Sequence, residues 1–148
     1  MSLEIIISDA IKDAMRAKDK IALDALRAVK SQILLVKTEA KGADVSAEQE
    51  IAILQRMIKQ RKDSFDQFTA QNRSDLAEVE QAQSTIIEKF LPQQLSTDEL
   101  ESEIKKIISQ TGAESAKDLG KVMGMASKAL AGKSDGKSIS DMAKKLLS

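Results

Sequence analysis

Apolar residues recur at spacings of three and four along most of this chain, and that spacing restricts the fold more than any other feature of the sequence. It matches one face of an α-helix, whereas a half-buried strand needs strict alternation. Long stretches also lack helix breakers, because the 148 residues include one proline and six glycines. The sequence therefore predicts an all-α fold.

The part of the chain before residue 96 predicts an N-terminal domain built on a long helical hairpin. We expect helices near residues 2–17, 21–41, 46–72 and 74–91, with the second and third helices forming the main seam. Gly42 is predicted at the C′ position of the second helix, and Ser46 with Gln49 predicts a capping box that opens the third. The fourth helix is expected to bury the apolar residues Leu76, Val79, Ile86 and Phe90.

The segment Leu91–Leu95, which contains Pro92, predicts the linker to a second domain. Ser96 and Glu99 have the spacing of another capping box, so a new helix is expected to start there and to end at Gly112. Two shorter helices are expected near 116–131 and 139–147, joined by a turn at 132–137. The predicted domains are thus residues 1–95 and a small three-helix domain of residues 96–148.

The composition excludes most catalytic chemistry. The chain has neither His nor Cys, so it lacks the usual bases, thiolate nucleophiles and metal ligands, and its carboxylates are not clustered with His. The triplets beginning at Gly132 and Gly136 resemble the end of a phosphate-binding loop, but the glycine required five positions earlier is replaced by Ser127 and Ala131. We therefore expect no catalytic residue, no metal site and no cofactor, and a function in binding.

The absence of Cys fits a reducing compartment. The sequence contains no run of 18 apolar residues, the length that a membrane-spanning helix needs. The first ten residues lack the basic start of a secretory signal. The expectation is a soluble, cytoplasmic protein with no membrane partner.

The predicted helix 116–131 has the residue pattern that most clearly indicates a binding site. Lys117, Lys121, Gly124 and Lys128 fall within an arc of about 60° on a helical wheel, and Gly120 lies at the edge of that arc. Glycine inside a helix costs about 1 kcal/mol relative to alanine. One interpretation is that a phosphate backbone approaches the helix here, meeting three ammonium groups and no Cβ.

The alternative is that Gly120 and Gly124 admit a neighbouring helix, since they are spaced four residues apart. Charge leaves both interpretations open. The whole chain is neutral, with 23 basic and 23 acidic residues, but the part from Ser115 onward has seven lysines against three aspartates, a net charge of +4. Lys133, Gly136 and Lys137 belong to this basic end, and we include them with the lysines and glycines above as candidate contacts to structured RNA.

Arg61 stands out in the N-terminal domain because it occupies a seam position between Ile58 and Phe65. A charge at such a position must find a partner or reach solvent. We expect an Asp or Glu beside it.

Several runs occur in the same order as in one known family. They are Lys18–Lys20 with Leu23, Leu26 and Arg27; Gln60–Ser64; Arg73 with Asp75 and Leu76; Leu91–Leu95; Lys117–Gly124; and Asp135–Lys137. Together they resemble the GatB/YqeY family over nearly the whole chain. The C-terminal part is similar to the tail domain of the B subunit of the glutamine-dependent aminoacyl-tRNA amidotransferase.

The resemblance implies a helical N-terminal domain, a three-helix C-terminal domain and a tail that contacts tRNA. It also brings the label of carbon–nitrogen ligase with glutamine as amido donor. In the amidotransferase the transfer chemistry lies in other parts, so we expect a tRNA-binding accessory protein without catalysis of its own. The alternative partner is a protein, such as an amidotransferase component or a synthetase, that docks a helix on the Gly120 and Gly124 face.

Overall fold

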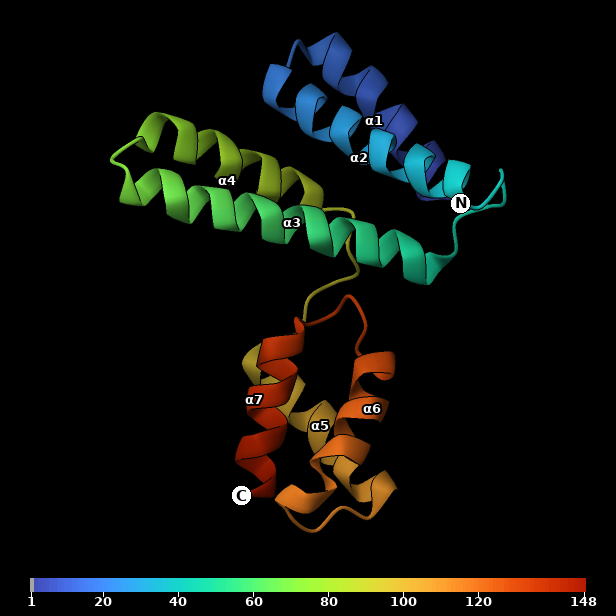
Figure 1. The fold of residues 1–148 in the computed structure, drawn as a ribbon, viewed down its shortest axis with the longest axis vertical. Coiled ribbons are helices and arrows are strands. Elements are labelled where there is room, and N and C mark those ends of the chain that lie inside the picture. Colours follow the sequence, from blue (N-terminus) through green and yellow to red (C-terminus); the bar gives the residue numbers. More distant parts are fainter. Residues whose placement is uncertain (1) are drawn as a thin grey trace. The chain divides into compact units, whose positions relative to one another are not determined.

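The computed structural model describes residues 2–148, and this range folds entirely into helices and connecting segments (Figure 1). The all-α prediction is confirmed. The elements in chain order are α1 (Leu3–Ala17), α2 (Lys20–Glu39), α3 (Ala47–Ala70), α4 (Ser74–Glu88), α5 (Thr97–Thr111), the 3-10 helix η1 (Ala116–Asp118), α6 (Leu119–Ala129) and α7 (Gly136–Leu147).

The chain divides into two compact units, Met1–Leu91 and Pro92–Ser148. We had predicted the boundary after residue 95. Residues 92–95 belong to the second unit because the Leu95 amide donates a hydrogen bond to the Lys133 carbonyl (2.9 Å), and the Leu95 side chain packs against that unit's core. Gln94 adds a side-chain hydrogen bond to the Gly132 carbonyl.

Unit 1 consists of two antiparallel helical pairs, α1 with α2 and α3 with α4 (Figure 1). Helix α2 contacts both α3 and α4, but its contact with α3, the predicted main seam, is smaller than the contact between α3 and α4. The reason is that the buried residues of α3, from Ile53 to Ile58, lie in its first half, whereas the second half packs against α4 alone. The fully buried Ile7, Ile33, Leu54 and Ile87 form the centre of this core.

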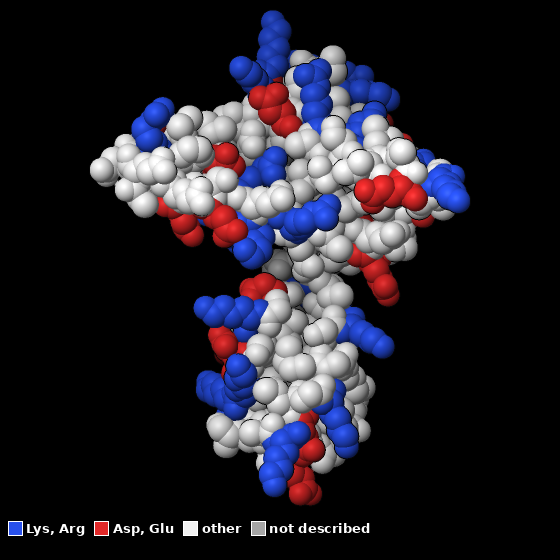
Figure 2. Space-filling view, in the orientation of Figure 1, with Lys and Arg blue, Asp and Glu red and all other residues white. Residues whose placement is uncertain are grey.

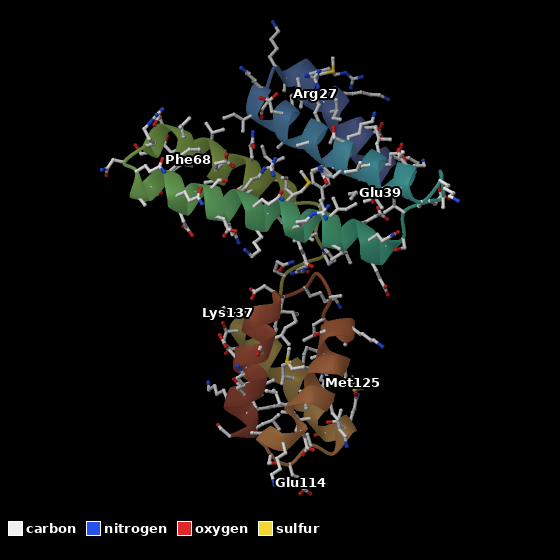
Figure 3. The ribbon with its side chains drawn as sticks, in the orientation of Figure 1. Arg27, Glu39, Phe68, Glu114, Met125 and Lys137 are labelled. Atoms are coloured by element: carbon white, nitrogen blue, oxygen red, sulfur yellow. The ribbon has the colours of Figure 1, made fainter. Side chains whose placement is uncertain are left out.

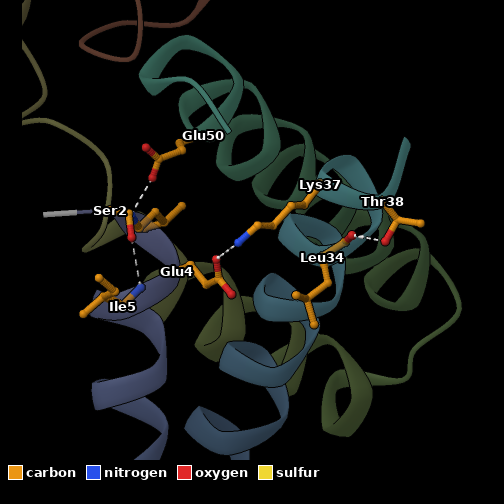
Figure 4. Close-up of polar contacts among 8 residues, drawn as sticks. Ser2, Glu4, Ile5, Leu34, Lys37, Thr38 and Glu50 are labelled. Carbon is orange, nitrogen blue, oxygen red and sulfur yellow. Dashed lines mark hydrogen bonds and ion pairs between the residues drawn. The ribbon is translucent and has the colours of Figure 1, made fainter. Parts of the chain in front are cut away.

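Polar contacts join the start of α1 to α2 and α3 (Figure 4). The Ser2 hydroxyl accepts a hydrogen bond from the Ile5 amide, and Glu50 at the start of α3 accepts one from the Leu3 amide (2.6 Å). Lys37 near the end of α2 pairs with Glu4 at 3.0 Å, and this hydrogen bond raises the pKa of Lys37. The first two contacts satisfy α1 amide groups that lack a partner within the helix, and the third joins the side chains of α1 and α2.

Helix ends follow the local sequence closely, with one shift. The capping box of Ser46 and Gln49 is confirmed. Gly42 was predicted at C′, but Lys41 adopts the left-handed conformation there (φ 56°) and Gly42 occupies the next position. The Gly42 amide donates to the Lys37 carbonyl and the Lys41 amide to the Thr38 carbonyl, which is the Schellman pattern.

Two predictions for the α3–α4 pair need correction. The predicted inner face of α4 is confirmed at Ile86 and Phe90, which pack against the core, and wrong at Val79, which is exposed. The buried residues of α4 are Ala77, Ser84 and Ile87. The face includes a serine and an alanine, which a search for large apolar residues passes over. Arg61 has no carboxylate within ion-pair distance in residues 2–148; it donates instead to the Gln83 amide oxygen and the Met57 carbonyl, both at 3.3 Å.

Unit 2 contains three α-helices around a core that includes the fully buried Ile104, Val122, Ala126 and Ala143. Ser96 caps α5 by accepting a hydrogen bond from the Glu99 amide, but Glu99 does not return one, so the predicted capping box is half formed. The predicted helix 116–131 begins with the separate turn η1. Helix α7 starts at Gly136 rather than 139 because Asp135 caps it, accepting a hydrogen bond from the Ser138 amide at 2.7 Å.

Candidate nucleic-acid interface

Helix α6 presents its glycines on the side opposite its buried face. Val122 and Ala126 are fully buried against α5 and α7, whereas Gly120 and Gly124 are exposed. A Cβ built on either glycine would meet no atom within 4 Å. No other helix of unit 2 therefore packs on these glycines, and packing within this unit gives no reason for them.

Lys121 and Lys128 lie next to these glycines on α6, and both are exposed. They stand seven residues apart, which is about 10 Å along a helix axis. Lys117 is also exposed, but it lies in η1 rather than in the helix, so the wheel that grouped it with the others does not apply to it. We call Gly120, Lys121, Gly124 and Lys128 the glycine face.

The charge next to this face is partly balanced. Asp118, at the start of α6, accepts a hydrogen bond from the Glu114 amide at 3.0 Å. That bond lowers the pKa of Asp118, and the nearby Lys121 ammonium lowers it further. Lys117 and Lys121 nonetheless take part in none of the ion pairs formed among residues 2–148. Their ammonium groups are available to an outside anion.

The other candidate contacts lie away from the glycine face. Lys133 is in the connection between α6 and α7, and Gly136 and Lys137 form the first turn of α7 instead of the predicted turn. Figure 3 shows Lys137 and Met125 of α6 on opposite sides of this unit. The structure thus groups four of the eight candidates on one helix, places Lys117 just before that helix, and spreads the remaining three over the α6–α7 end.

Positive charge in unit 2 is local. Residues 92–148 contain nine lysines and eight carboxylates, a net charge of +1, and four of those carboxylates are on α5. Figure 2 shows one face of this unit, on which lysine side chains lie at several places, some of them beside acidic side chains. The excess of lysine over carboxylate is therefore restricted to the part of the chain from η1 to α7.

Sequence reasoning passed over one residue beside the glycine face. Met125 follows Gly124 and is 40% exposed, as are several other large apolar side chains of this chain, so its interest lies in its position and not in its exposure. It was missed because the charged stripe, not the apolar one, was used to define the site. Residues 2–148 contain no group of three acidic side chains placed to hold a metal ion, and none of their helices is long and apolar enough to cross a membrane.

A comparison with protein families finds one match that covers almost the whole chain. The family model described as "Yqey-like protein" matches residues 5–147. This agrees with the resemblance that we drew from the ordered runs of residues.

Three curated proteins from yeasts, each named "Altered inheritance of mitochondria protein 41, mitochondrial", are similar to most of the chain. The protein from Lachancea thermotolerans is 35% identical over 95 residues, covering 64% of this chain and 51% of the relative. That from Saccharomyces cerevisiae is 33% identical over 100 residues, covering 66% and 54%. That from Meyerozyma guilliermondii is 34% identical over 127 residues, covering 79% and 67%. The matches to the first two relatives thus span about half of their length.

Proposed function

Because this chain belongs to the YqeY-like family, whose C-terminal part is related to the tail domain of the tRNA amidotransferase B subunit, we propose that it is a tRNA-binding accessory protein. The binding surface is the glycine face of α6, with Lys117, Lys133, Gly136 and Lys137 as outer contacts. The chain binds the RNA backbone and its shape, since structured RNA offers few base edges to side chains.

The observation that carries the proposal is the open space over Gly120 and Gly124. Gly124 lies in the interior of an eleven-residue helix, where glycine costs stability, and Gly120 lies in the first turn. Nothing inside unit 2 uses the space that these two glycines leave. A phosphate backbone lying across this face would approach the helix closely and place its oxygens between Lys121 and Lys128. Aromatic stacking contributes nothing in unit 2, because all three phenylalanines of the chain are in unit 1.

Nitrocellulose filter binding of purified chain to tRNA, measured at several salt concentrations, tests this proposal. The slope of log affinity against log salt is expected to be about −3 to −4, from a footprint of about four phosphates. Substituting Lys121→Gln together with Lys128→Gln should reduce the magnitude of that slope by roughly 2.

A matched control is available in the same unit. Lys105→Gln with Lys106→Gln removes the same charge from α5, whose lysines already pair with Glu101 and Glu103. The control should leave the slope almost unchanged. Absence of tRNA retention at low salt, or equal effects of the two double variants, would refute the proposal.

The family label of carbon–nitrogen ligase with glutamine as amido donor attaches to this chain by kinship. The chain has no Cys or His, and catalytic nucleophiles need an activating base. We therefore propose no amidation by the chain alone. Incubating charged tRNA with glutamine and the purified chain checks this, and formation of amidated aminoacyl-tRNA would overturn it.

A second candidate function is protein–protein adaptor, and exposed Met125 is the observation that favours it. An apolar side chain at the edge of a glycine face suits a packed partner helix better than a phosphate backbone. The partner in that case would be an amidotransferase component or a synthetase. Ribonuclease treatment before a pull-down with one of these proteins distinguishes the two functions, because a protein partner stays bound after RNA is removed.

The compartment follows from the same proposal, since a tRNA-binding protein must work where tRNA is present. From the sequence we predicted the cytoplasm, whereas the names of the yeast relatives place those proteins in the mitochondrion. Fractionation of the source cells with an antibody to this chain would distinguish the two compartments.

A further inference from the structure

Exposed apolar side chains of unit 1 collect on α1 and α2. Eight large apolar residues are exposed in residues 2–148, and six of them lie on these two helices: Ile5, Ile6, Met15, Ile21, Leu34 and Leu35. The Glu4–Lys37 ion pair holds the first turn of α1 beside the end of α2 (Figure 4). Four of the six therefore lie at one end of this helix pair, and we call them the apolar end: Ile5, Ile6, Leu34 and Leu35. Single exposed apolar residues are ordinary, but a group of neighbours indicates a contact surface.

Packing inside unit 1 does not use the apolar end. Ile5 is turned by about 160° around α1 from the fully buried Ile7, and Leu34 by about 140° around α2 from the fully buried Val29. None of the four residues packs against the core of this unit, whereas the half-buried Val36 of α2 does. A contact that removes the apolar end from water must come from outside unit 1.

Cations without ion pairs follow one side of α2. Lys20, Arg27 and Leu34 are spaced seven residues apart, so they lie within about 40° of one another around the helix. Lys30 lies one turn before Leu34 on the same side. None of these three cations takes part in an ion pair among residues 2–148, whereas both basic residues of α1 pair with aspartates. This side of α2 thus combines free positive charge with an exposed leucine.

Charge is divided unevenly between the two helix pairs of unit 1. Residues 2–41, which include α1 and α2, contain eight basic and six acidic residues, a net charge of +2. Residues 42–91, which include α3 and α4, contain six basic and nine acidic residues, a net charge of −3. Figure 2 shows basic side chains gathered over the part of unit 1 that α1 and α2 form. An anionic surface would therefore attract the α1–α2 side of this unit and repel the α3–α4 side.

We propose that unit 1 docks on an anionic lipid bilayer through the apolar end and the basic side of α2. Ile5 and Leu34 enter the boundary between headgroups and acyl chains, and Lys20, Arg27 and Lys30 contact lipid phosphates. Attachment of this kind needs no membrane-spanning helix. The expectation of no membrane partner was drawn from the lack of such a helix, so it does not bear on surface attachment.

A bilayer fits this surface better than two other partners. An RNA backbone would meet the cations but leave the exposed leucines in water. A second copy of the chain, bound through the same surface, would place two positively charged surfaces against each other. An anionic bilayer offers negative headgroups and, about 5–10 Å deeper, an apolar layer. Both halves of the surface therefore find a matching partner in one ligand.

Cosedimentation of the purified full chain with lipid vesicles tests the proposal. Binding to vesicles of equal parts phosphatidylcholine and phosphatidylglycerol should be at least about tenfold tighter than binding to phosphatidylcholine alone. The reason is that each lysine or arginine near an anionic surface strengthens binding by about fivefold. Raising the salt concentration should remove most of this difference, because salt screens exposed charges.

Substitution at the apolar end should weaken vesicle binding. Leu34→Ser should reduce affinity for the anionic vesicles by about five- to tenfold, because the side chain that enters the bilayer is lost. Val79→Ser is the matched control, since Val79 is 38% exposed and Leu34 is 43% exposed, but Val79 lies on α4. The control should bind as the unmodified chain does. Circular dichroism checks that both variants keep their helices.

Removal of charge from α2 should have the larger effect. Lys20→Gln with Arg27→Gln should weaken binding to the anionic vesicles by roughly 10- to 30-fold. Lys59→Gln with Lys62→Gln removes the same charge from α3, whose two lysines already pair with Asp63 and Glu88. This control should not weaken binding.

A single introduced cysteine reports which side of unit 1 enters the lipid, because the chain contains no other cysteine. Leu34→Cys, labelled with a fluorophore that brightens in apolar surroundings, should brighten when anionic vesicles are added. Val79→Cys with the same label should not. Brightening at both positions would overturn the proposed orientation.

Three further outcomes would overturn the proposal. One is equal binding to neutral and anionic vesicles, or binding to neither. Another is loss of vesicle binding in Lys121→Gln with Lys128→Gln, which would assign the binding to the basic end of unit 2. The third is a dimer in solution, seen by light scattering, that Leu34→Ser separates, because a second copy would then cover the apolar end. Leu34→Ser should leave tRNA retention unchanged, so this proposal and the proposed function can fail separately.

Discussion

The two units use glycine for different purposes, and the difference separates what the fold needs from what it leaves unexplained. Unit 1 has a single glycine, Gly42, and its φ of 86° at the end of α2 is a conformation that other residues rarely adopt. In unit 2, Gly112 and Gly132 also have positive φ (69° and 76°). Gly120, Gly124 and Gly136 have ordinary helical backbone and open space where a Cβ would be.

A glycine with positive φ is explained by its own backbone, whereas neither backbone nor packing explains a glycine in a helix with free space around it. Unit 1 contains no glycine of the second kind and unit 2 contains three. This is why the proposed RNA surface lies on α6 and not on the lysine-bearing helix α2, although α2 also carries exposed basic residues such as Lys20 and Arg27. The comparison holds only if the two units are separately stable and if the two kinds of glycine respond oppositely to substitution.

The largest effect expected concerns the separate cores. Ile104 is fully buried in the core of unit 2, so Ile104→Ala should destabilise that unit by about 2–5 kcal/mol. Hydrogen exchange followed by mass spectrometry measures this as lost protection in peptides of residues 92–148. Ile87→Ala is the matched variant for unit 1 and should affect residues 2–91. Equal loss of protection in both units from either substitution would show that the cores do not fold independently.

How far the sequence could predict this molecule depends on the range of the interactions involved. Caps such as Ser46 with Gln49 depend on residues three apart, and they were predicted because a short segment contains all the information. The inner face of α4 was predicted only in part, because Ala77 and Ser84 are small residues that are buried only once α4 packs against α2 and α3. The burial of the Ser84 hydroxyl could not be predicted for the same reason, because it depends on the packing of α4 and not on its own sequence.

The candidate interface shows the same division. Exposure of Gly120, Lys121, Gly124 and Lys128 followed from the helical wheel, because one helix positions all four. The positions of Lys133 and Lys137 did not follow, because they depend on where α7 begins. Asp135 caps that helix at Gly136, and a three-residue difference in its start turns a predicted loop residue into a helical one.

The next effect in size is a loss of stability at Gly112. In Gly112→Ala the new Cβ meets no atom within 4 Å, so the penalty comes from the positive φ alone. We expect unit 2 to lose about 1–2 kcal/mol, the cost of the left-handed conformation for an L-residue with a side chain. Urea denaturation followed by circular dichroism measures it. An unchanged free energy of unfolding would contradict the view that this glycine is required by its backbone.

A smaller effect of opposite sign is expected at Gly124. Gly124→Ala has the same free space but an ordinary helical backbone, so it should stabilise unit 2 by up to about 1 kcal/mol. The same variant should weaken tRNA retention in the filter assay, because the methyl group keeps the phosphate backbone away. Stabilisation with undiminished tRNA binding would mean that the glycine face does not contact RNA. Destabilisation would remove the distinction between the two kinds of glycine.

The smallest effect concerns Asp118, whose carboxylate holds the turn that leads into α6. It accepts a hydrogen bond from the Glu114 amide, which lowers the pKa of Asp118, with a further contribution from Lys121. A carboxyl group with a lowered folded-state pKa adds stability above its ordinary pKa, and that stability is lost as the pH falls through the folded-state value. Unit 2 should therefore lose stability at acidic pH, below the ordinary aspartate pKa of about 3.9.

Thermal unfolding between pH 5 and the acid limit, compared with Asp118→Asn, measures this contribution. The variant lacks the carboxylate, so its melting temperature should fall less steeply over that range than that of the unmodified chain. Asp141→Asn alters an exposed carboxylate of α7 that accepts no hydrogen bond from residues 2–148, and it should follow the unmodified chain. If the melting temperature of Asp118→Asn falls as steeply as that of the unmodified chain, the carboxylate does not hold the turn. The positions of Lys117 and Lys121 must then be set by the helix alone.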